Sequence, residues 1–317
     1  MPPERPTTPR VRPDARAVAA LFAAQAFFAC FPVLGKIALR EAETMTIAAC
    51  RVVFGSIFLT VAARLLAKDE RPPTWKERGT IAVLSLLGIV LNQLLYITGL
   101  SLSNAADVAL LVCTIPVFTL LIGMVAGREK PGIRRAAGIP VALAGALLLL
   151  NVHSLDWHDR MLVGNVLVVL NCLFYSFFLI GSRDILATRS PLSFTAAIFR
   201  YGTIPVLLFA IPSLTRFHPA ALSRGTVLAI GAIVLFPTAL SYLLNAVALA
   251  RTDAATAAIF HYMQPVLAWL LAWAVLGERP GPRFLAAAGL IFAGLLLTTW
   301  PSRARASAPA SPEEALE

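Results

Sequence analysis

The sequence predicts an all-α polytopic membrane protein whose ten transmembrane helices form two inverted five-helix repeats. Three observations predict this fold: an apolar composition, ten long apolar segments, and an internal repeat. Of the 317 residues, 58% are hydrophobic and only 14% are charged, and the mean hydropathy is +0.77. Soluble domains are nearer half apolar and a quarter charged, so this composition indicates a chain embedded in a lipid bilayer.

The apolar segments are each long enough to cross a bilayer, which takes about 20 residues of helix. They are continuous and rich in Ala and Leu rather than alternating, which favours helices over membrane strands. Proline- and arginine-rich residues 1–16 and polar residues 301–317 are predicted to be disordered tails. The ten predicted spans are 17–38, 44–66, 79–100, 105–126, 133–151, 161–182, 192–212, 225–249, 254–276 and 282–300.

The basic residues predict how the chain sits in the membrane. If residues 1–16 are cytoplasmic, the inside segments hold 18 Lys and Arg residues and the outside segments hold 6. Cytoplasmic loops carry the excess of Lys and Arg, so we expect a multi-pass protein of the cell membrane (the cytoplasmic or inner membrane) with both termini cytoplasmic. The net charge of +10 is divided among these short segments, so we expect the lipid bilayer as a partner and no nucleic acid.

An offset of 149 residues superimposes the second half of the chain on the first. No gap is needed between 92–148 and 241–297, and the two predicted repeats are 17–151 and 161–300. Each repeat holds five spans, so the second copy enters the membrane from the opposite side. Inverted repeats of this kind are typical of transporters with a site at the bilayer midplane. The matched pairs are Pro116 with Pro265, Glu129 with Glu278, Pro131-Gly132 with Pro280-Gly281, Arg134 with Arg283, and Arg51 with Arg200.

Pro116 and Pro265 predict a kink in spans 4 and 9, because each removes a backbone donor inside an apolar helix. Two interpretations stay open: a kink that only serves packing, and a kink that lines a water-filled cavity, where freed carbonyl groups are tolerated. Glu129 and Glu278 stand beside Pro-Gly turns, where they would stop a helix at the interface. Asn104 is predicted to cap the helix that follows it.

These motifs together identify a family. They are TIPVFTLLIG and MQPVLAWLLAW around the prolines, GERPG after Leu276, and an arginine early in the second span of each half, in MTIAACRVVFGSIFL and FTAAIFRYGTIPVLL. REKPG after span 4 is a looser copy that lacks a glycine directly before its glutamate. Over about residues 17–300 the chain resembles EamA-type permeases of the drug/metabolite transporter superfamily. The resemblance implies a central pathway lined by spans 1–4 and 6–9, and substrates such as amino acids, other small metabolites, nucleotide sugars or drugs.

Polar side chains within the spans are the candidates for a substrate cavity. Arg51 and Arg200 would clamp a substrate carboxylate or, structurally, tie helix-end carbonyls together. The amides and tyrosines would either join helices or line a wet cavity. The full set of candidates is Gln25, Arg51, Asn92, Gln93, Tyr96, Asn171, Tyr175, Arg200, Tyr242, Asn245, His261 and Gln264.

The predicted function is alternating-access transport of small organic metabolites, amino acids or related solutes, by export or exchange. Multidrug or cation efflux by the same fold, and a receptor or scaffold without transport, are the alternatives. The sequence contains no HExxH, GxSxG or P-loop pattern and no CxxC pair, so no enzyme activity, cofactor or metal is expected. No carboxylate lies in the middle of a span, which favours exchange or facilitated movement over proton coupling. A homodimer stays open.

Overall fold

The computed structural model describes residues 15–67, 71–127, 132–150, 158–249, 260 and 263–299. Within these ranges the regular elements are all helices and no strand occurs, which confirms the all-α prediction. The predicted disordered tails fall largely outside the described residues, as do Glu129 and His261.

Eight helical segments are long and apolar enough to cross a membrane, and two shorter apolar helices follow them. The eight are 15–38, 44–66, 75–102, 105–125, 133–150, 160–186, 191–214 and 224–245, and the shorter two are 263–276 and 282–298. The boundaries agree with the predicted spans to within a few residues, except that the start of predicted span 9 lies outside the described residues.

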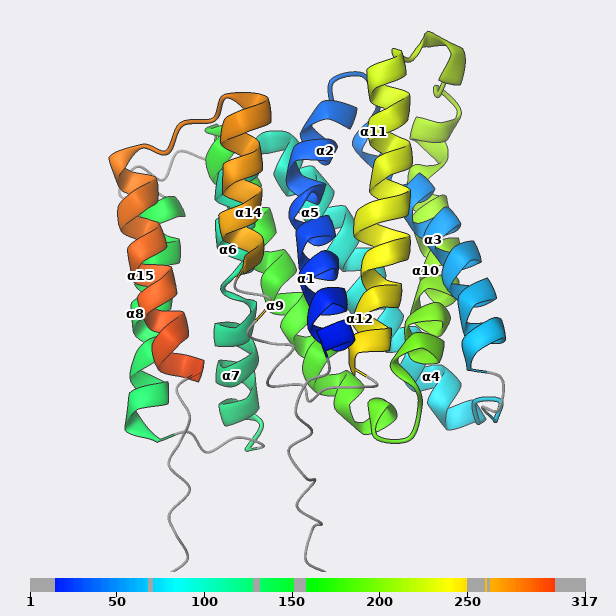
Figure 1. Cartoon of the computed structure of the whole chain (residues 1–317), viewed down its shortest axis with the longest axis horizontal. Coiled ribbons are helices and arrows are strands. Elements are labelled where there is room, and N and C mark those ends of the chain that lie inside the picture. Colours follow the sequence, from blue (N-terminus) through cyan, green and yellow to red (C-terminus); the bar gives the residue numbers. More distant parts are fainter. Residues whose placement is uncertain are drawn as a thin grey trace, which may run out of the picture.

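Several of the long segments are divided into shorter elements, because the chain is interrupted at prolines and at wide helical turns (Figure 1). The elements are α1 Ala15–Ala29, α2 Phe31–Ala38, α3 Thr44–Leu66, α4 Trp75–Ser85, the π-helix η1 Leu86–Leu91, α5 Asn92–Leu102, α6 Ala105–Val112, α7 Ile115–Val125, α8 Ile133–Leu150, α9 Arg160–Leu186, α10 Pro191–Leu214, the 3₁₀ turn η3 Pro219–Ala221, α11 Arg224–Val234, the π-helix η4 Leu235–Leu240, α12 Ser241–Leu249, α14 Met263–Leu271, the π-helix η5 Ala272–Leu276 and α15 Pro282–Thr299.

The helices run roughly parallel to one another between two ends of the molecule (Figure 1). We call the upper end in this view the Glu278 end, because the turn between η5 and α15 lies there. We call the lower end the Glu77 end, after the first turn of α4. The segment α1–α2 begins at the Glu77 end and finishes at the Glu278 end.

The offset of 149 residues reappears in the bounds of the elements. It relates α4 to α11, η1 to η4, and α8, at Ile133–Leu150, to α15, at Pro282–Thr299. In Figure 1, α4 to α5 rises from the Glu77 end, whereas α11 to α12 descends from the Glu278 end. The π-helices η1 and η4 therefore lie at equivalent positions, and the segments α4–α5 and α11–α12 run in opposite directions.

Helices α8 and α15 pack in direct backbone contact at one side of the molecule. A Cβ atom on Gly138 would lie 2.5 Å from the Gly294 carbonyl oxygen, so only glycine allows this approach. Each helix also carries an arginine that bonds the last carbonyls of the other. Arg283 donates to Leu148 at 2.7 Å and to Leu149 at 2.6 Å, and Arg135 donates to Thr298 at 2.9 Å.

The largest apolar cluster joins the two halves of the chain. It includes Ile47 and Leu59 of α3 and Ile89 of η1, together with Phe199 of α10 and Ile233 of α11. Because α3 and α10 bury their side chains in one shared core, the site described next lies between elements of both halves.

Candidate functional site

Arg51 is a buried cation on α3, one of the helices that form this shared core. Its side chain extends from α3 and the residue is only 5% exposed. The guanidinium Nε donates to the Thr238 hydroxyl at 2.8 Å and Nη1 donates to the Gln93 amide oxygen at 2.9 Å. Nη2 makes a long contact of 3.5 Å with the Pro237 carbonyl oxygen. Arg51 and Gln93 thus meet as members of the predicted candidate set, whereas sequence reasoning missed Thr238.

The π-helix η4 explains why Thr238 is available to Arg51. Pro237 has no N–H, so it leaves a carbonyl of the preceding turn without its usual donor. The Thr238 hydroxyl donates to the Ile233 carbonyl at 2.9 Å, and its oxygen then accepts from Arg51. The sequence signal was present, since a Pro-Thr pair in the middle of an apolar span indicates both a broken helix and a hydroxyl that bonds backbone.

An aromatic ring covers the guanidinium on another side. The Cζ atom of Arg51 lies 3.9 Å from the centroid of the Phe31 ring, which is a cation–π contact. Phe31 stacks in turn on Tyr96, with ring centroids 5.0 Å apart and planes at 11°. Phe31 is the first residue of α2, directly after the interruption at Cys30.

Arg51 makes no ion pair with a carboxylate in the part of the chain that the structure describes. Its hydrogen bonds go to a hydroxyl, an amide and a carbonyl, and the ion pairs of Glu43 and Glu77 are made with other arginines. A guanidinium carries five N–H donors, and a buried charge is costly unless it is paired. The arrangement can therefore accept an anionic group at low electrostatic cost.

The other aromatic and amide candidates make hydrogen-bonding or ring-packing contacts with residues other than Arg51. Asn171 donates to the Asn92 carbonyl at 2.9 Å, which joins α9 to α5. Tyr175 packs on Phe178, and Tyr242 meets Phe28 and Phe199 edge to face.

Arg200, the residue matched to Arg51 by the offset, has a different environment. It is exposed on α10, so the structure does not bring the two arginines into one buried cluster.

Two candidate amides have buried polar atoms without a hydrogen-bond partner. Gln25 of α1 is 0% exposed, and neither its amide nitrogen nor its amide oxygen has a partner. The side-chain oxygen of Asn245 on α12 is also buried and unpartnered. Gln264 on α14 is half-buried. Pro265 is buried in the first turn of α14, and Pro116 lies in the first turn of α7 directly after the break at Cys113 and Thr114.

Glu278 caps a helix from the other half of the chain, a role that sequence reasoning missed. Its carboxylate accepts the backbone N–H groups of Ala105 at 3.0 Å and Ala106 at 2.9 Å, at the start of α6. Asn104 occupies the position before α6 but its side chain makes no capping bond, so the prediction that Asn104 caps this helix is wrong. The Asn104 amide instead makes a long contact of 3.5 Å with Asp107.

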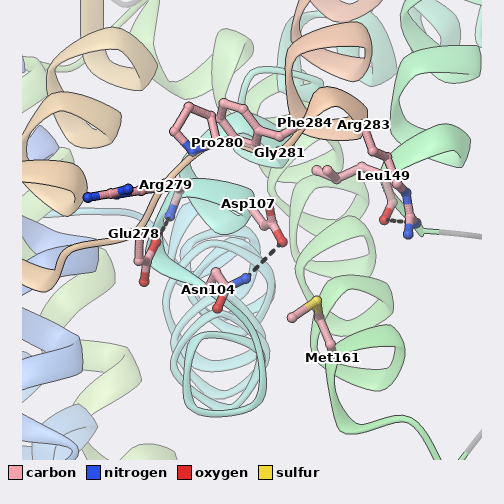
Figure 2. Close-up of a pocket in the computed structure, with 11 residues that line it drawn as sticks. Asn104, Asp107, Leu149, Met161, Glu278, Arg279, Pro280, Gly281, Arg283 and Phe284 are labelled. Carbon is pink, nitrogen blue, oxygen red and sulfur yellow. Dashed lines mark hydrogen bonds between the residues drawn. The ribbon is translucent and has the colours of Figure 1, made fainter.

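A cavity of about 220 Å³ borders this cap (Figure 2). Its polar walls come from Asn104, Asp107, Glu278, Arg279 and Arg283, and it lies at the Glu278 end rather than beside Arg51. No group of three metal-ligating side chains occurs among the residues for which coordinates are described.

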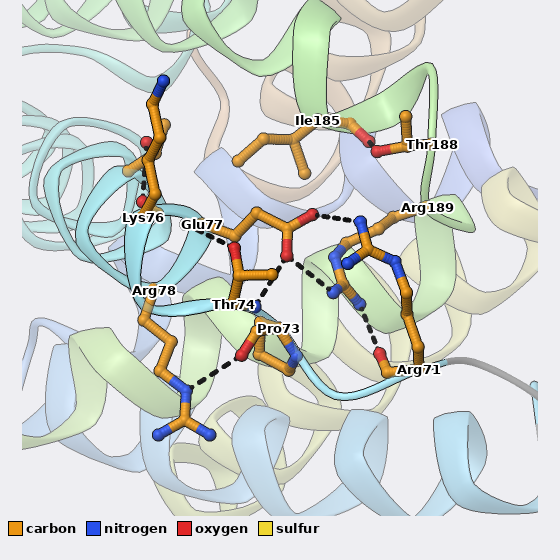
Figure 3. Close-up of polar contacts among 10 residues, drawn as sticks. Arg71, Pro73, Thr74, Lys76, Glu77, Arg78, Ile185, Thr188 and Arg189 are labelled. Atoms are coloured by element: carbon orange, nitrogen blue, oxygen red, sulfur yellow. Dashed lines mark hydrogen bonds and ion pairs between the residues drawn. The ribbon is translucent and has the colours of Figure 1, made fainter.

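At the opposite end of the molecule, Glu77 joins the start of α4 to neighbouring segments (Figure 3). Its carboxylate accepts from the Thr74 backbone at 2.7 Å, from Arg71 at 2.9 Å and from Arg189 at 3.2 Å. Thr74 and Glu77 form a capping box at the start of α4, and Arg189 connects this turn to the segment between α9 and α10.

Glu43, in the loop between α2 and α3, makes a further set of polar contacts at the Glu278 end. The Ser213 hydroxyl donates to Glu43 at 2.6 Å, and Arg216 contacts the same oxygen at 3.0 Å. These two contacts hold the pKa of the Glu43 carboxyl below its ordinary value.

A bundle of apolar helices with a buried, unpaired cation and buried amides defines a multi-pass membrane protein of the transporter class. The chain belongs to the EamA-like transporter family, whose pattern matches twice, at residues 15–151 and 162–300. The predicted resemblance is therefore confirmed.

Similar proteins carry transporter names. An uncharacterized transporter of Archaeoglobus fulgidus is 28% identical over 83% of this chain and 90% of its own length. A probable terminal-alkyne amino-acid exporter of Streptantibioticus cattleyicolor is 26% identical over 82% of this chain and 86% of its own length. A solved crystal structure with 19% identity covers 89% of this chain and 96% of that chain with a TM-score of 0.62, which shows a common fold.

Proposed function

We propose that this protein is an alternating-access transporter of amino acids or closely related carboxylates, acting by export or exchange, and that Arg51 binds the substrate carboxylate. The observation that carries the proposal is the buried guanidinium of Arg51, held between the two halves by neutral partners alone. A substrate carboxylate would supply the counter-charge and use the remaining N–H donors. The name of the Streptantibioticus cattleyicolor relative, an amino-acid exporter, supports this choice of substrate.

The proposed architecture is ten spans in two inverted repeats of five, with the Glu77 end cytoplasmic. The double family match and the offset of 149 residues between α4–η1 and α11–η4 support it. Inverted repeats place a substrate site between the halves, where each half can rock against the other. Arg51 of α3 and Thr238 of η4 come from different halves, so such rocking would change the contacts around the bound carboxylate.

The test is flux of labelled amino acids in proteoliposomes. We expect Arg51→Gln to abolish flux while Arg64→Gln, which alters an exposed arginine on the same helix, leaves it unchanged. Flux in the Arg51→Gln variant equal to that of the unmodified chain would refute the proposed role.

Cation efflux is the weaker alternative, because a buried positive charge at the centre repels cationic solutes. A receptor or scaffold would show no flux with any solute, so the same assay separates this alternative from transport.

A further inference from the structure

Gln25 is a buried amide whose missing hydrogen bonds are not explained by the proposed carboxylate site at Arg51. It is 0% exposed, and both polar atoms of its side chain lack partners among the described residues. Burying an amide without hydrogen bonds is energetically costly, because the group loses its bonds to water and gains none in the protein. An apolar residue would pack in its place at no such cost, so the amide indicates a polar group that is absent from the chain itself.

Contacts along α1 and α12 place Asn245 opposite Gln25. Phe28 meets Tyr242 with ring centroids 5.3 Å apart, and Leu21 clusters with Ala248. The two helices run in opposite directions, so these contacts bracket the register between them. Gln25 lies between Leu21 and Phe28 on one face of α1, and Asn245 lies between Tyr242 and Ala248 on α12.

The helix α14 supplies a third amide near this layer. Ala29 of α1 and Ala268 of α14 belong to one small buried cluster. Both helices rise toward the Glu278 end, so one turn back toward the Glu77 end leads from Ala29 to Gln25 and from Ala268 to Gln264. We call Gln25, Asn245 and Gln264 the amide layer.

The amide layer lies roughly two helix turns from the carboxylate site. Along α1, Gln25 precedes Phe31, which covers Arg51, by six residues, or about 9 Å at 1.5 Å per residue. Along η4 and α12, Asn245 follows Thr238, which bonds Arg51, by seven residues, or about 10 Å. Two separate helices thus give the same spacing.

We propose that the amide layer is a second subsite that binds an uncharged hydrogen-bonding group, a carboxamide or hydroxyl, at the far end of the substrate. This rests on the proposed function, in which Arg51 holds the carboxylate. Gln25 offers a donor and an acceptor, and Asn245 offers an acceptor, which matches a carboxamide or hydroxyl that both donates and accepts. The α-ammonium group of an amino acid stays beside its carboxylate, so the amide layer meets the end of the side chain and selects polar amino acids.

The test compares L-glutamine with L-norleucine, which have nearly equal length and differ in the terminal carboxamide. Dissociation constants are measured by ligand-induced thermal shift on the purified full chain. We expect the unmodified protein to prefer glutamine by about tenfold or more, because a site built to hydrogen-bond its ligand rejects the analogue that lacks the group. In Gln25→Leu the preference falls to about one while norleucine still binds, which also shows that the variant is folded.

Controls separate this subsite from a buried, water-filled or simply strained position. Thr46→Val removes a buried hydroxyl on α3 that, like the Gln25 amide, has no partner, and it should leave the glutamine preference unchanged. Gln25→Met, whose side chain has nearly the same shape, is the second variant should the leucine fail to fold. A preference in both Gln25 variants equal to that of the unmodified protein would overturn the subsite, and water alone would then occupy the layer.

Arg51→Gln distinguishes failure of the subsite from failure of the proposed function. Loss of binding of both amino acids in Arg51→Gln, with an unaltered preference in Gln25→Leu, refutes the subsite alone. Binding of neither amino acid by the unmodified protein refutes both proposals.

Discussion

Removing the Glu278 carboxylate should expose the first turn of α6. Glu278 is the only capping group that the structure places on the Ala105 and Ala106 amides within the described residues, and it comes from the loop before α15. We therefore expect Glu278→Ala to free both amides and to loosen the contact between the two halves at this end.

The magnitude follows from the two hydrogen bonds. A hydrogen bond to a charged group contributes about 1.5–3 kcal/mol, and a helix cap about 0.5–2 kcal/mol. The adjoining cavity of about 220 Å³ admits water, which can solvate freed amides, so we take a total near the lower end, about 2 kcal/mol. Since each 1.36 kcal/mol is a factor of ten, local opening should become about thirtyfold more frequent.

Hydrogen–deuterium exchange of the peptide that contains Ala105 and Ala106 measures this opening. Exchange should accelerate about thirtyfold in Glu278→Ala, while Arg279→Ala, which alters the exposed neighbour, should match the unmodified protein. Equal protection in Glu278→Ala and Arg279→Ala would show that the cap contributes nothing and would refute the reasoning.

Four further measurements probe other parts of the structure. Gly145→Ala should lower the thermal unfolding temperature, because the added Cβ would lie 2.8 Å from the Ala287 carbonyl oxygen. Gly289→Ala is the control, since its Cβ meets no atom within 4 Å and should not lower this temperature; equal effects of the two variants would contradict this packing. Thr238→Val removes a hydrogen-bond partner of Arg51 and a donor to Ile233, so we expect stability to fall by about 1–3 kcal/mol, checked by denaturant unfolding, and no loss would contradict the contact. The folded-state pKa of Glu43 is lowered, so its stabilising contribution is present above the ordinary glutamate pKa and is lost as pH falls through the lowered value. In Glu43→Gln the unfolding temperature should therefore fall less on acidification, and a pH profile equal to that of the unmodified protein would contradict this role of Glu43. Cysteines placed by Gly132→Cys and Gly281→Cys should react with impermeant reagents from opposite sides of the membrane, and labelling of both from one side would contradict the inverted arrangement that we propose.

The sequence was sufficient to predict the helices because their signal is local. Apolar length fixes a span, and the eight long segments of the structure coincide with predicted ones. It was also sufficient to select Arg51, since a charge within an apolar span must find a protein environment.

The partners of these residues could not be predicted in the same way, because they depend on packing between distant segments. Thr238 meets Arg51 across 187 residues of sequence, and Glu278 meets Ala105 across 173. Asn104 had the right residue type and position for a cap, yet a carboxylate from another loop occupies the site. A charged acceptor bonds two amides more strongly than a neutral amide bonds one, which explains the outcome.

The difference between Arg51 and Arg200 has a physical cause in the same offset that makes them a pair. Arg51 donates to Thr238 and Gln93. The residues at the equivalent positions for Arg200 are Ile89 and Tyr242, so the hydroxyl acceptor is replaced by a hydrocarbon side chain. A guanidinium could not be buried there without losing a hydrogen bond, and Arg200 is exposed.

The π-helices η1 and η4 show how related backbones can carry different chemistry. η1 and η4 have equivalent bounds, but η1 holds Gly88, where an added Cβ would lie 2.5 Å from the Phe178 ring, while η4 holds Pro237. In η1, the missing side chain of Gly88 lets the Phe178 ring of α9 pack closely. In η4 the proline's missing N–H draws the Thr238 hydroxyl to the Ile233 carbonyl and so fixes the acceptor that meets Arg51. One half of the chain therefore supplies the cation and the other supplies the turn that orients it, and the carboxylate-binding site that we propose needs both.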